Sequence, residues 1–345
     1  MISKKILFLV VTASMLFNQI TFAAESFKSI KELDTHIKKS GFNGAILVMK
    51  GSKTLMRGAF GYRDIETKTP LHITDKFQIG SNTKQIVAAA VLKLQEQGKL
   101  SLEDEVTKYL PEYTRFNEIK VRDLLNHTSG IVNYTEHTDF MASRTYKKVL
   151  TLDDIIDHVS KFKLDFKPRT KWKYSNGGFI VAGKIIELAS GVSWNAYVKR
   201  EILDPFDMND TDHNVYFEKV SKVRGHLNGS VVRNLNLSWA LSAGSLHSTV
   251  DDMAKWLSIY GDSKILDNDS KKEMQKSFLN SYALGIFSHP YGFDHILSHA
   301  GVTRGFYSKT FYLKKSKIKI VTIENMNGLN KDIPDLVLKH FYKNY

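Results

Sequence analysis

The chain has 345 residues, of which 42% are hydrophobic and 25% are charged, and its formal net charge is +13. This composition is typical of an ordinary globular protein with a sizeable core, and it excludes a chain that is disordered throughout. There is no cysteine, which excludes disulfides and a lipid-modified cysteine. No linker rich in Pro, Ser or Gly divides the chain, so we expect one compact unit with two lobes.

The N-terminus has the pattern of an export signal. Lys4 and Lys5 precede an apolar run from Ile6 to Phe17, and small residues follow around Ala23. This order predicts a secretory signal peptide over residues 1–23 and a mature chain over residues 24–345. An uncleaved membrane anchor is the alternative, although the run is short for a bilayer. Export without cysteine favours a bacterial envelope protein, so we expect it to be soluble after cleavage and periplasmic or secreted.

The positive charge is scattered along the chain. Removal of Lys4 and Lys5 with the signal would lower the formal charge from +13 to +11, and stretches such as KKSKIK at Lys314–Lys319 carry part of the rest. Such lysines are typical of solvated surface. A basic exported protein is attracted to anionic polymers, so we expect association with the anionic cell envelope and no nucleic-acid partner.

Strand patterns lie near both ends of the mature chain. Residues 44–64 contain two strand-like runs around a Gly51-Ser52 turn, and residues 305–325 contain two more around Lys314–Ser316. Each pair predicts a hairpin. The two hairpins predict one sheet built from both ends of the chain.

Helical patterns fill the middle of the chain. The run from Ser81 stops at Gly98, a second run from Asn176 stops at Gly191, and the last residues predict a C-terminal helix. We therefore predict an α+β fold, an α/β sandwich whose antiparallel sheet is flanked by helices, plus a helical lobe. The predicted boundaries are residues 27–76 and 242–345 for the α/β lobe and residues 77–241 for the helical lobe.

The first candidate for chemistry is Ser81 with Lys84, at the start of the apolar helix. Residues three apart share one helix face, so the amine can reach the hydroxyl. A lysine can accept the serine proton only if burial lowers its pKa, and the apolar helix behind it offers that environment. The alternative for an isolated S-x-x-K is a helix N-cap serine followed by a solvated lysine.

Two further motifs could complete a site. Tyr174-Ser175-Asn176 precedes the second helix and offers a phenol that can pass protons and an amide that can hold a substrate carbonyl. His299-Ala300-Gly301 lies just before the C-terminal hairpin, where we expect a strand start. There a glycine admits a substrate close to the strand, and a histidine supplies charge or a hydrogen bond.

In this order, S-x-x-K, Y-x-N and H-x-G resemble the active-site set of penicillin-recognising serine hydrolases. The resemblance is to the class C beta-lactamase family, with its D-alanyl-D-alanine carboxypeptidases, D-aminopeptidases and esterases, and it spans about residues 44–325. The segments VRDLLNHTSGI at Val121–Ile131 and YALGIF at Tyr282–Phe287 also look like that family's framework. The resemblance implies a beta-lactamase/transpeptidase-like fold.

The resemblance also implies roles for individual residues. Ser81 would be the nucleophile, Lys84 would activate it while hydrogen-bonded to Tyr174, and Tyr174 would relay protons. Asn176 would orient the substrate's amide, and the backbone N–H groups of Ser81 and Val302 would form the oxyanion hole. Neither a metal nor another cofactor is expected.

The third motif departs from true class C beta-lactamases, which carry lysine, threonine and glycine where His299, Ala300 and Gly301 stand. Since histidine titrates near pH 6.5, charge at this position is expected to depend on pH. Ala300 lacks the hydroxyl that helps to hold a carboxylate. Arg304 could replace that function through a bidentate pair with a C-terminal carboxylate, the alternative being an ordinary surface arginine.

These observations predict an exported serine hydrolase that acts through an acyl-enzyme on Ser81. The expected partner is a small-molecule or peptidoglycan-peptide substrate. The preferred one is a D-amino acid peptide of the cell wall, which would make the protein a D-alanyl-D-alanine carboxypeptidase or a D-amino acid peptidase. A beta-lactamase-like carboxylesterase and a beta-lactamase are the alternatives within the family. An inactive cell-wall-binding or regulatory protein on the same scaffold is the alternative of another class.

Overall fold

The computed structural model describes residues 27–144, 149–232, 236–327 and 332–345. The predicted signal peptide therefore lies outside the described residues. Within the described ranges, no helix combines the length and the apolar character needed to cross a membrane.

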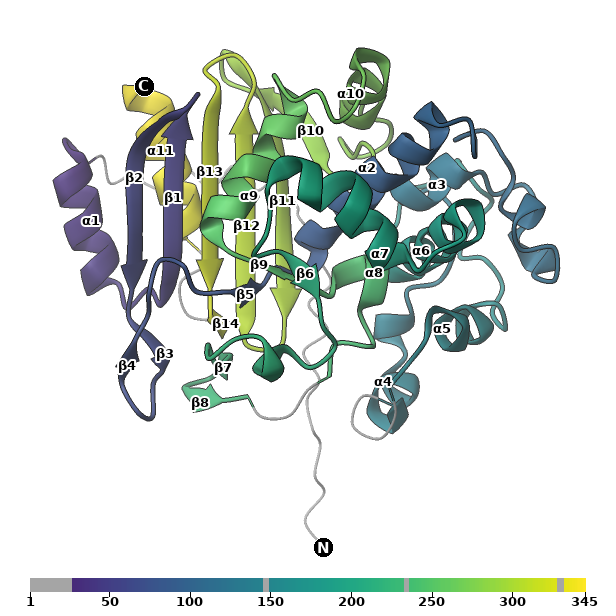
Figure 1. The fold of residues 1–345 in the computed structure, drawn as a ribbon, viewed down its shortest axis with the longest axis horizontal. Coiled ribbons are helices and arrows are strands. Elements are labelled where there is room, and N and C mark those ends of the chain that lie inside the picture. Colours follow the sequence, from purple (N-terminus) through teal and green to yellow (C-terminus); the bar gives the residue numbers. More distant parts are fainter. Residues whose placement is uncertain (1–26, 145–148, 233–235, 328–331) are drawn as a thin grey trace, which may run out of the picture.

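A six-stranded antiparallel sheet forms the centre of the molecule, in the order β10-β11-β12-β13-β1-β2 (Figure 1). β1 pairs along its whole length with β13, so strands from the two ends of the chain lie side by side as predicted. The fold class is thereby confirmed. The strands are β1 (Gly44–Lys50), β2 (Lys53–Phe60), β10 (Phe287–Tyr291), β11 (Asp294–Thr303), β12 (Phe306–Leu313) and β13 (Ile318–Glu324).

Both faces of the sheet are buried. In β1, Ala45 and Leu47 belong to the core on the side of the helical lobe, whereas Ile46 and Val48 belong to a second core under the terminal helices. This alternation follows from the two-residue period of a strand. The terminal helices are α1 (Ile30–Lys39) and α11 (Ile333–Asn344), and both lie at the outer side of the sheet in Figure 1.

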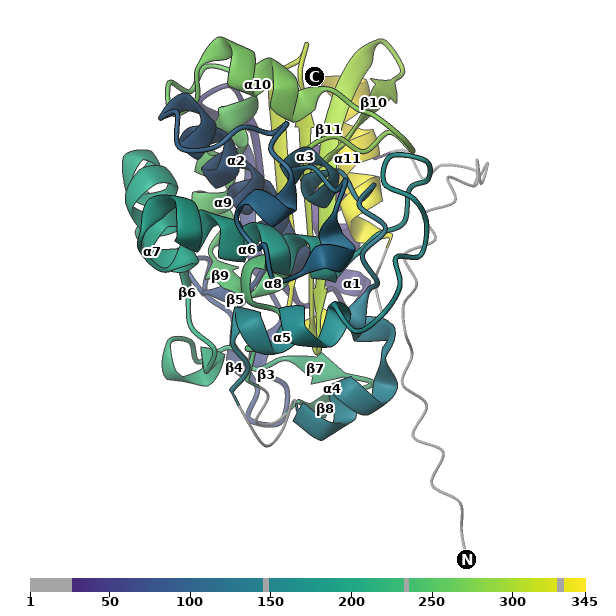
Figure 2. The same ribbon diagram turned by 90° about the vertical axis from the view of Figure 1, so that its right-hand side faces the viewer.

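Most of the other helices lie on the opposite side of the sheet, and in Figure 2 that side faces the viewer. They are α2 (Thr83–Glu96), α3 (Val121–Leu125), α4 (Thr138–Arg144), α5 (Leu152–Val159), α6 (Asn176–Ser190), α7 (Trp194–Val198), α8 (Leu241–Gly244), α9 (Val250–Trp256) and α10 (Asn268–Gln275). Short strands complete the fold: β3 (Tyr62–Asp64), β4 (Thr69–Pro70), β5 (Phe77–Gln78), β6 (Asp212–His213), β7 (His226–Leu227), β8 (Ser230–Val231), β9 (Leu246–Ser248) and β14 (Met326–Asn327). The lobe boundaries at residues 77 and 241 stay a prediction.

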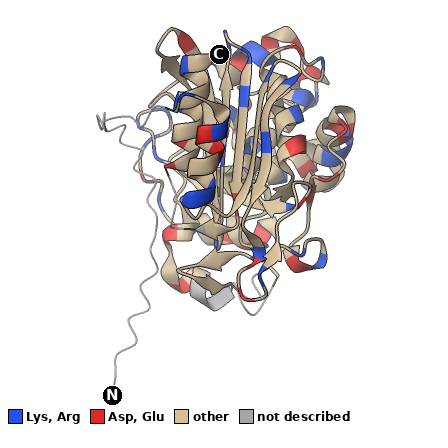
Figure 3. Cartoon of the chain, turned by 90° about the vertical axis from the view of Figure 1, so that its left-hand side faces the viewer, with Lys and Arg blue, Asp and Glu red and all other residues tan. Residues whose placement is uncertain are grey.

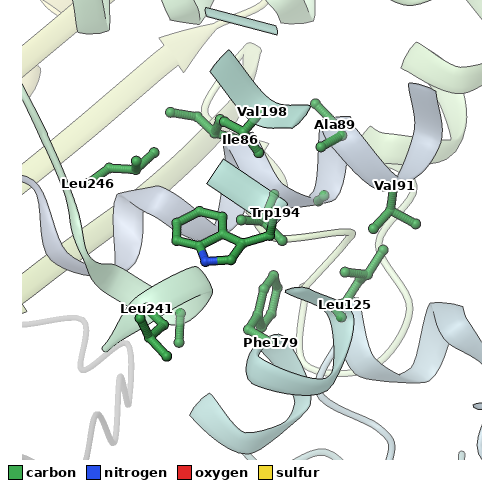
Figure 4. Packing of buried hydrophobic residues seen from close by; sticks show 14 of the residues in the cluster. Ile86, Ala89, Val91, Leu125, Phe179, Trp194, Val198, Leu241 and Leu246 are labelled. Carbon is green, nitrogen blue, oxygen red and sulfur yellow. The ribbon is translucent and has the colours of Figure 1, made fainter. Parts of the chain in front are cut away.

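Helices α2 and α6 are the buried helices that the sequence predicted. α2 is covered on all sides because it lies between the sheet and the other helices, and every residue from Thr83 to Leu92 is buried. Figure 4 shows Trp194 of α7 between Ile86 of α2 and Phe179 of α6 in the shared core. Each fully buried aliphatic or aromatic side chain of this kind stabilises the fold by about 1.5–3 kcal/mol. The polar ends of α2 and α6 are thus held by a rigid apolar body.

Candidate active site

Ser81 lies on a single 3-10 turn, Gly80–Asn82, directly before α2. Its side chain is partly exposed, and its Oγ accepts a hydrogen bond of 2.8 Å from the hydroxyl of Tyr174. The Nζ of Lys84 lies 3.1 Å from the same Oγ. The structure therefore brings the serine, the amine and the phenol of the first two motifs together around one oxygen atom.

A buried polar network anchors this turn to β12. The amide of Asn82 donates to Ser308 Oγ at 2.7 Å, and Thr310 Oγ1 donates to Asn82 Oδ1 at 2.8 Å. Ser308 in turn donates to the carbonyl of Ile79 at 2.7 Å. Because each of these groups has a partner, the network holds the serine turn against the sheet without an unpaired polar atom.

Lys84 is fully buried, and its hydrogen-bond partners are uncharged. Its Nζ donates to the carbonyl of Ala243 at 2.6 Å and to Asn176 Oδ1 at 2.8 Å. Burial lowers the pKa of Lys84 well below its usual value. A neutral amine has two N–H groups and one lone pair. Since the two carbonyl oxygens can only accept, they engage both N–H groups and leave the lone pair to face the hydroxyl of Ser81.

Tyr174 lies in the loop before α6, with its ring 4.2 Å from the ring of His127. Burial raises the pKa of Tyr174 far above neutral pH, so its hydroxyl keeps its proton and donates to Ser81. The predicted direct hydrogen bond between Lys84 and Tyr174 is wrong. Lys84 Nζ lies 4.9 Å from the centre of the tyrosine ring, and Ser81 Oγ connects the two groups.

Asn176 is the first residue of α6, and both ends of its amide are occupied. Oδ1 accepts from Lys84, while Nδ2 donates to Asn133 Oδ1 at 3.1 Å and to Thr135 Oγ1 at 3.2 Å. The prediction gave this amide to the substrate. In the structure Oδ1 accepts an N–H of Lys84 and thereby positions its amine, and the role of Asn176 toward the substrate stays a prediction.

His299 lies in the second half of β11 rather than at a strand start, and it is fully buried. Its Nδ1 is 2.6 Å from the carbonyl of Ala300, which can only accept, so Nδ1 carries the proton and Nε2 accepts from the hydroxyl of Tyr282 at 2.8 Å. Burial lowers the pKa of His299 to about 3, and the charge of Lys84 acts in the same direction whenever that amine is protonated. The expectation of a histidine that titrates near pH 6.5 is therefore wrong.

Gly301 and Gly80 let β11 approach the serine turn. A Cβ on Gly301 would lie 1.8 Å from the carbonyl oxygen of Ile79, and one on Gly80 would lie 2.7 Å from the backbone nitrogen of Val302. Gly80 also has a φ of +51°, which favours glycine. This close approach places the backbone of Val302 beside that of Ser81, as an oxyanion hole built from their N–H groups requires.

Arg304 lies two residues beyond Val302, and its side chain is exposed. It lines a pocket at the end of β11 together with Gln78 and Trp239. The other predicted site residues gather around Ser81, and Arg304 lies at the margin of this group.

Sequence reasoning missed the residues that support the site. Asn133 holds Asn176, and Tyr282 holds His299. His127 accepts a hydrogen bond of 3.2 Å from the backbone N–H of Ser175, and its buried Nε2 has no partner among the described residues. The segments that contain His127 and Tyr282 resemble the family's framework, so the sequence carries a signal, but only the fold shows what these side chains touch.

No metal centre accompanies this arrangement in the described part of the chain, where no three His, Asp or Glu side chains lie close enough to share an ion.

Comparison with known proteins gives the following matches. A family model described as "Beta-lactamase" matches residues 31–337. Penicillin-binding protein 4* of Bacillus subtilis (strain 168) is 35% identical over 189 residues, which cover 54% of this chain and 41% of that protein. Protein flp of Staphylococcus aureus (strain NCTC 8325 / PS 47) is 28% identical over 332 residues, which cover 90% of this chain and 65% of that protein. The chain thus spans less than two thirds of the length of these relatives.

Solved structures share the fold. An octameric penicillin-binding protein homologue from Pyrococcus abyssi superposes with a TM-score of 0.80 and 27% identity, over 91% of this chain and 78% of that one. A D-amino acid amidase from Ochrobactrum anthropi SV3 superposes with a TM-score of 0.76 and 24% identity, over 90% of this chain and 99% of that one.

Proposed function

This chain belongs to the beta-lactamase family, and from that premise we propose that it is a serine hydrolase that forms an acyl-enzyme on Ser81. One observation carries the proposal: the hydroxyl of Ser81 lies between a buried amine at 3.1 Å and a protonated phenol at 2.8 Å. A serine hydroxyl is a weak nucleophile, and an adjacent base is what activates it.

The proposed reaction begins with the proton of Ser81 passing to the lone pair of Lys84 while Oγ bonds to the substrate carbonyl carbon. The backbone N–H groups of Ser81 and Val302 stabilise the oxyanion. Tyr174 then donates its proton to the leaving nitrogen as the C–N bond breaks, which leaves a phenolate next to the acyl-enzyme and a protonated Lys84. In the second half water attacks the ester and gives its proton to the phenolate, while Lys84 returns its proton to Ser81 Oγ as the C–O bond breaks and Ser81 is freed.

For the substrate we propose an amide or peptide with a D-configured acyl residue and an uncharged leaving group. A penicillin-binding protein homologue and a D-amino acid amidase share the fold, which supports the class. The predicted carboxypeptidase needs a cation for the terminal carboxylate, and His299 at the third motif is neutral. His299 is also buried with both ring nitrogens bonded within the fold, so it offers the substrate no cation, and we favour a D-amino acid amide over a D-alanyl-D-alanine terminus. Esters and beta-lactams are the runners-up.

The test is a fluorophosphonate label followed by a substrate panel. We expect an adduct on Ser81 by mass spectrometry, and none on the Ser81→Ala variant. The panel compares D- and L-aminoacyl 4-nitroanilides, a peptide that ends in D-Ala-D-Ala, a short nitrophenyl ester and nitrocefin, with the D-anilide expected to react fastest among the amides. If neither label nor turnover is found, the alternative of an inactive cell-wall-binding or regulatory protein takes its place.

For location we propose export and contact with the anionic cell envelope. The support is the signal pattern over residues 1–23 and the net charge of +13. Figure 3 shows basic and acidic residues interspersed over one face of the molecule, which is unlike the continuous basic stripe of a nucleic-acid site. N-terminal sequencing of the mature protein and cell fractionation test this proposal, and an intact Met1 on cytoplasmic protein would contradict it.

A further inference from the structure

A small pocket lies where β11 ends, next to the candidate active site. Its volume is about 40 Å³, room for about three water-sized groups. Two of its lining residues are close in sequence to the reacting groups, since Gln78 precedes Ser81 by three residues and Arg304 follows Val302 by two. The pocket thus begins at the margin of the oxyanion hole.

The side-chain amide of Gln78 has no role inside the fold. The residue is 7% exposed, and its backbone is held by the pairing of β5 with β9. Its amide forms no hydrogen bond with any residue in the described ranges, and its polar atoms are not among the fully buried unpaired ones, so they are accessible from the pocket that the residue lines. A ligand in the pocket can therefore take this amide as a hydrogen-bond partner. Gln78 therefore points to a ligand with a polar end.

The charge around the pocket favours an anion. Arg224 and Arg304 are guanidinium groups of the lining, and Glu218 is its one carboxylate, so the lining carries a net positive charge. The remaining wall is apolar, with the rings of Phe217, Trp239 and Phe306. An apolar wall suits methylene groups, and guanidinium with an amide suits a carboxylate at their end.

The pocket lies on the acyl side of the nucleophile. The leaving group must receive its proton from Tyr174, whose ring lies 6.5 Å from the ring of His299. Arg304 follows His299 by five residues and comes directly after the last residue of β11, so at about 3.3 Å per strand residue its backbone lies roughly 16 Å beyond that of His299. The acyl part, which stays on Ser81, extends toward that end.

We propose that this pocket binds the side chain of the substrate's acyl residue and selects a short side chain that ends in a carboxylate. The inference rests on the proposed function, because it requires Ser81 to carry that acyl group. The sequence analysis paired Arg304 with the C-terminal carboxylate of the substrate. In this inference Arg304 binds the acyl side chain, on the opposite side of the cleaved bond.

Protection of Ser81 from a fluorophosphonate tests the pocket without turnover. The competitors are N-acetyl-D-glutamate, N-acetyl-D-glutamine and N-acetyl-D-norvaline, which share the same main chain. We expect the glutamate derivative to halve the labelling rate at about a tenfold lower concentration than the glutamine derivative, as for a charge-assisted hydrogen bond. Gln78→Met and Arg304→Gln should each reduce this preference to less than about threefold.

Lys53→Gln is the matched control, since Lys53 is an exposed cation at the start of β2, outside the pocket lining. We expect it to leave the preference unchanged, which separates contact in the pocket from the general field of the protein. Labelling of Ser81 with equal protection by glutamate and glutamine, or a preference that both pocket variants retain, would overturn the inference. Absence of labelling would instead contradict the proposed function, so the two failures are distinguishable.

Discussion

The two walls of the candidate site differ in how they present their chemistry. The helical wall, with Lys84, Tyr174 and Asn176, acts through side chains joined by short hydrogen bonds. The strand wall, β11, brings the backbone close at Gly301 and Val302 and carries a neutral histidine. In the proposed mechanism the helical wall therefore carries out the proton transfers, and the strand wall adds the N–H of Val302 to that of Ser81 for the oxyanion.

The largest effect is expected when the proton donor of the helical wall is removed. Tyr174→Phe should lower kcat/KM for an anilide by about 10²–10⁴-fold, because the leaving nitrogen loses its acid. A nitrophenyl ester, whose leaving group needs no proton, should lose much less. Steady-state kinetics on both substrates measure the difference, and equal losses would show that Tyr174 does not protonate the leaving group.

On the strand wall, Gly301→Ala should separate β11 from the serine turn, since its Cβ would lie 1.8 Å from the carbonyl oxygen of Ile79. We expect kcat/KM to fall by about 10²–10³-fold, as on loss of an oxyanion-hole donor. Gly244→Ala is the matched control, because there the nearest atom would lie at an ordinary 3.5 Å. A folded Gly301→Ala enzyme with full activity would contradict the assignment.

A charge next to the amine tests whether Lys84 acts in its neutral form. Asn176→Asp would place a carboxylate 2.8 Å from Lys84 Nζ, which raises the pKa of the amine. The acidic limb of the pH profile of kcat/KM should move to higher pH, with a loss of about 10–100-fold at pH 7. Asn133→Asp, one hydrogen bond further away, should shift that limb less. An unchanged limb in Asn176→Asp would mean that Lys84 is not the base.

The smallest effect on activity is expected at His299. With a pKa of about 3 it stays neutral from pH 5 to 8, so the ratio of wild-type to His299→Gln rates should be constant over that range. Stability should respond instead. Between pH 3 and 6.5 the imidazole of His299 is protonated in the unfolded state but stays neutral in the folded state. The free energy of unfolding therefore falls as the pH falls below 6.5.

For wild type this contribution amounts to about 2 kcal/mol at pH 5, and His299→Gln should lack it. Urea unfolding at pH 7.5 and 5.0 measures the difference, with replacement of the exposed His72 by glutamine as the control. If the ratio of wild-type to His299→Gln rates changed with pH, His299 would titrate in the folded enzyme, as the sequence analysis predicted.

Much of this molecule could be read from sequence because the signals are local. The apolar run after Lys84, the glycine after each helix and the two hairpins predict elements that the structure contains. The spacing of Ser81 and Lys84 also predicts their contact, since three residues make about one helical turn. The convergence of the three motifs came from the resemblance to the family rather than from any local pattern.

The residues themselves determined which groups are available: a hydroxyl, an amine, a phenol, and glycines where two backbones must meet. Only the tertiary structure decided their states, because pKa and hydrogen-bond direction depend on neighbours from distant segments. Lys84 is desolvated between Ala243 and Asn176, and His299 is locked between Tyr282 and its own strand. The sequence gives the identity of a side chain, but its protonation state depends on the neighbours that the fold places around it.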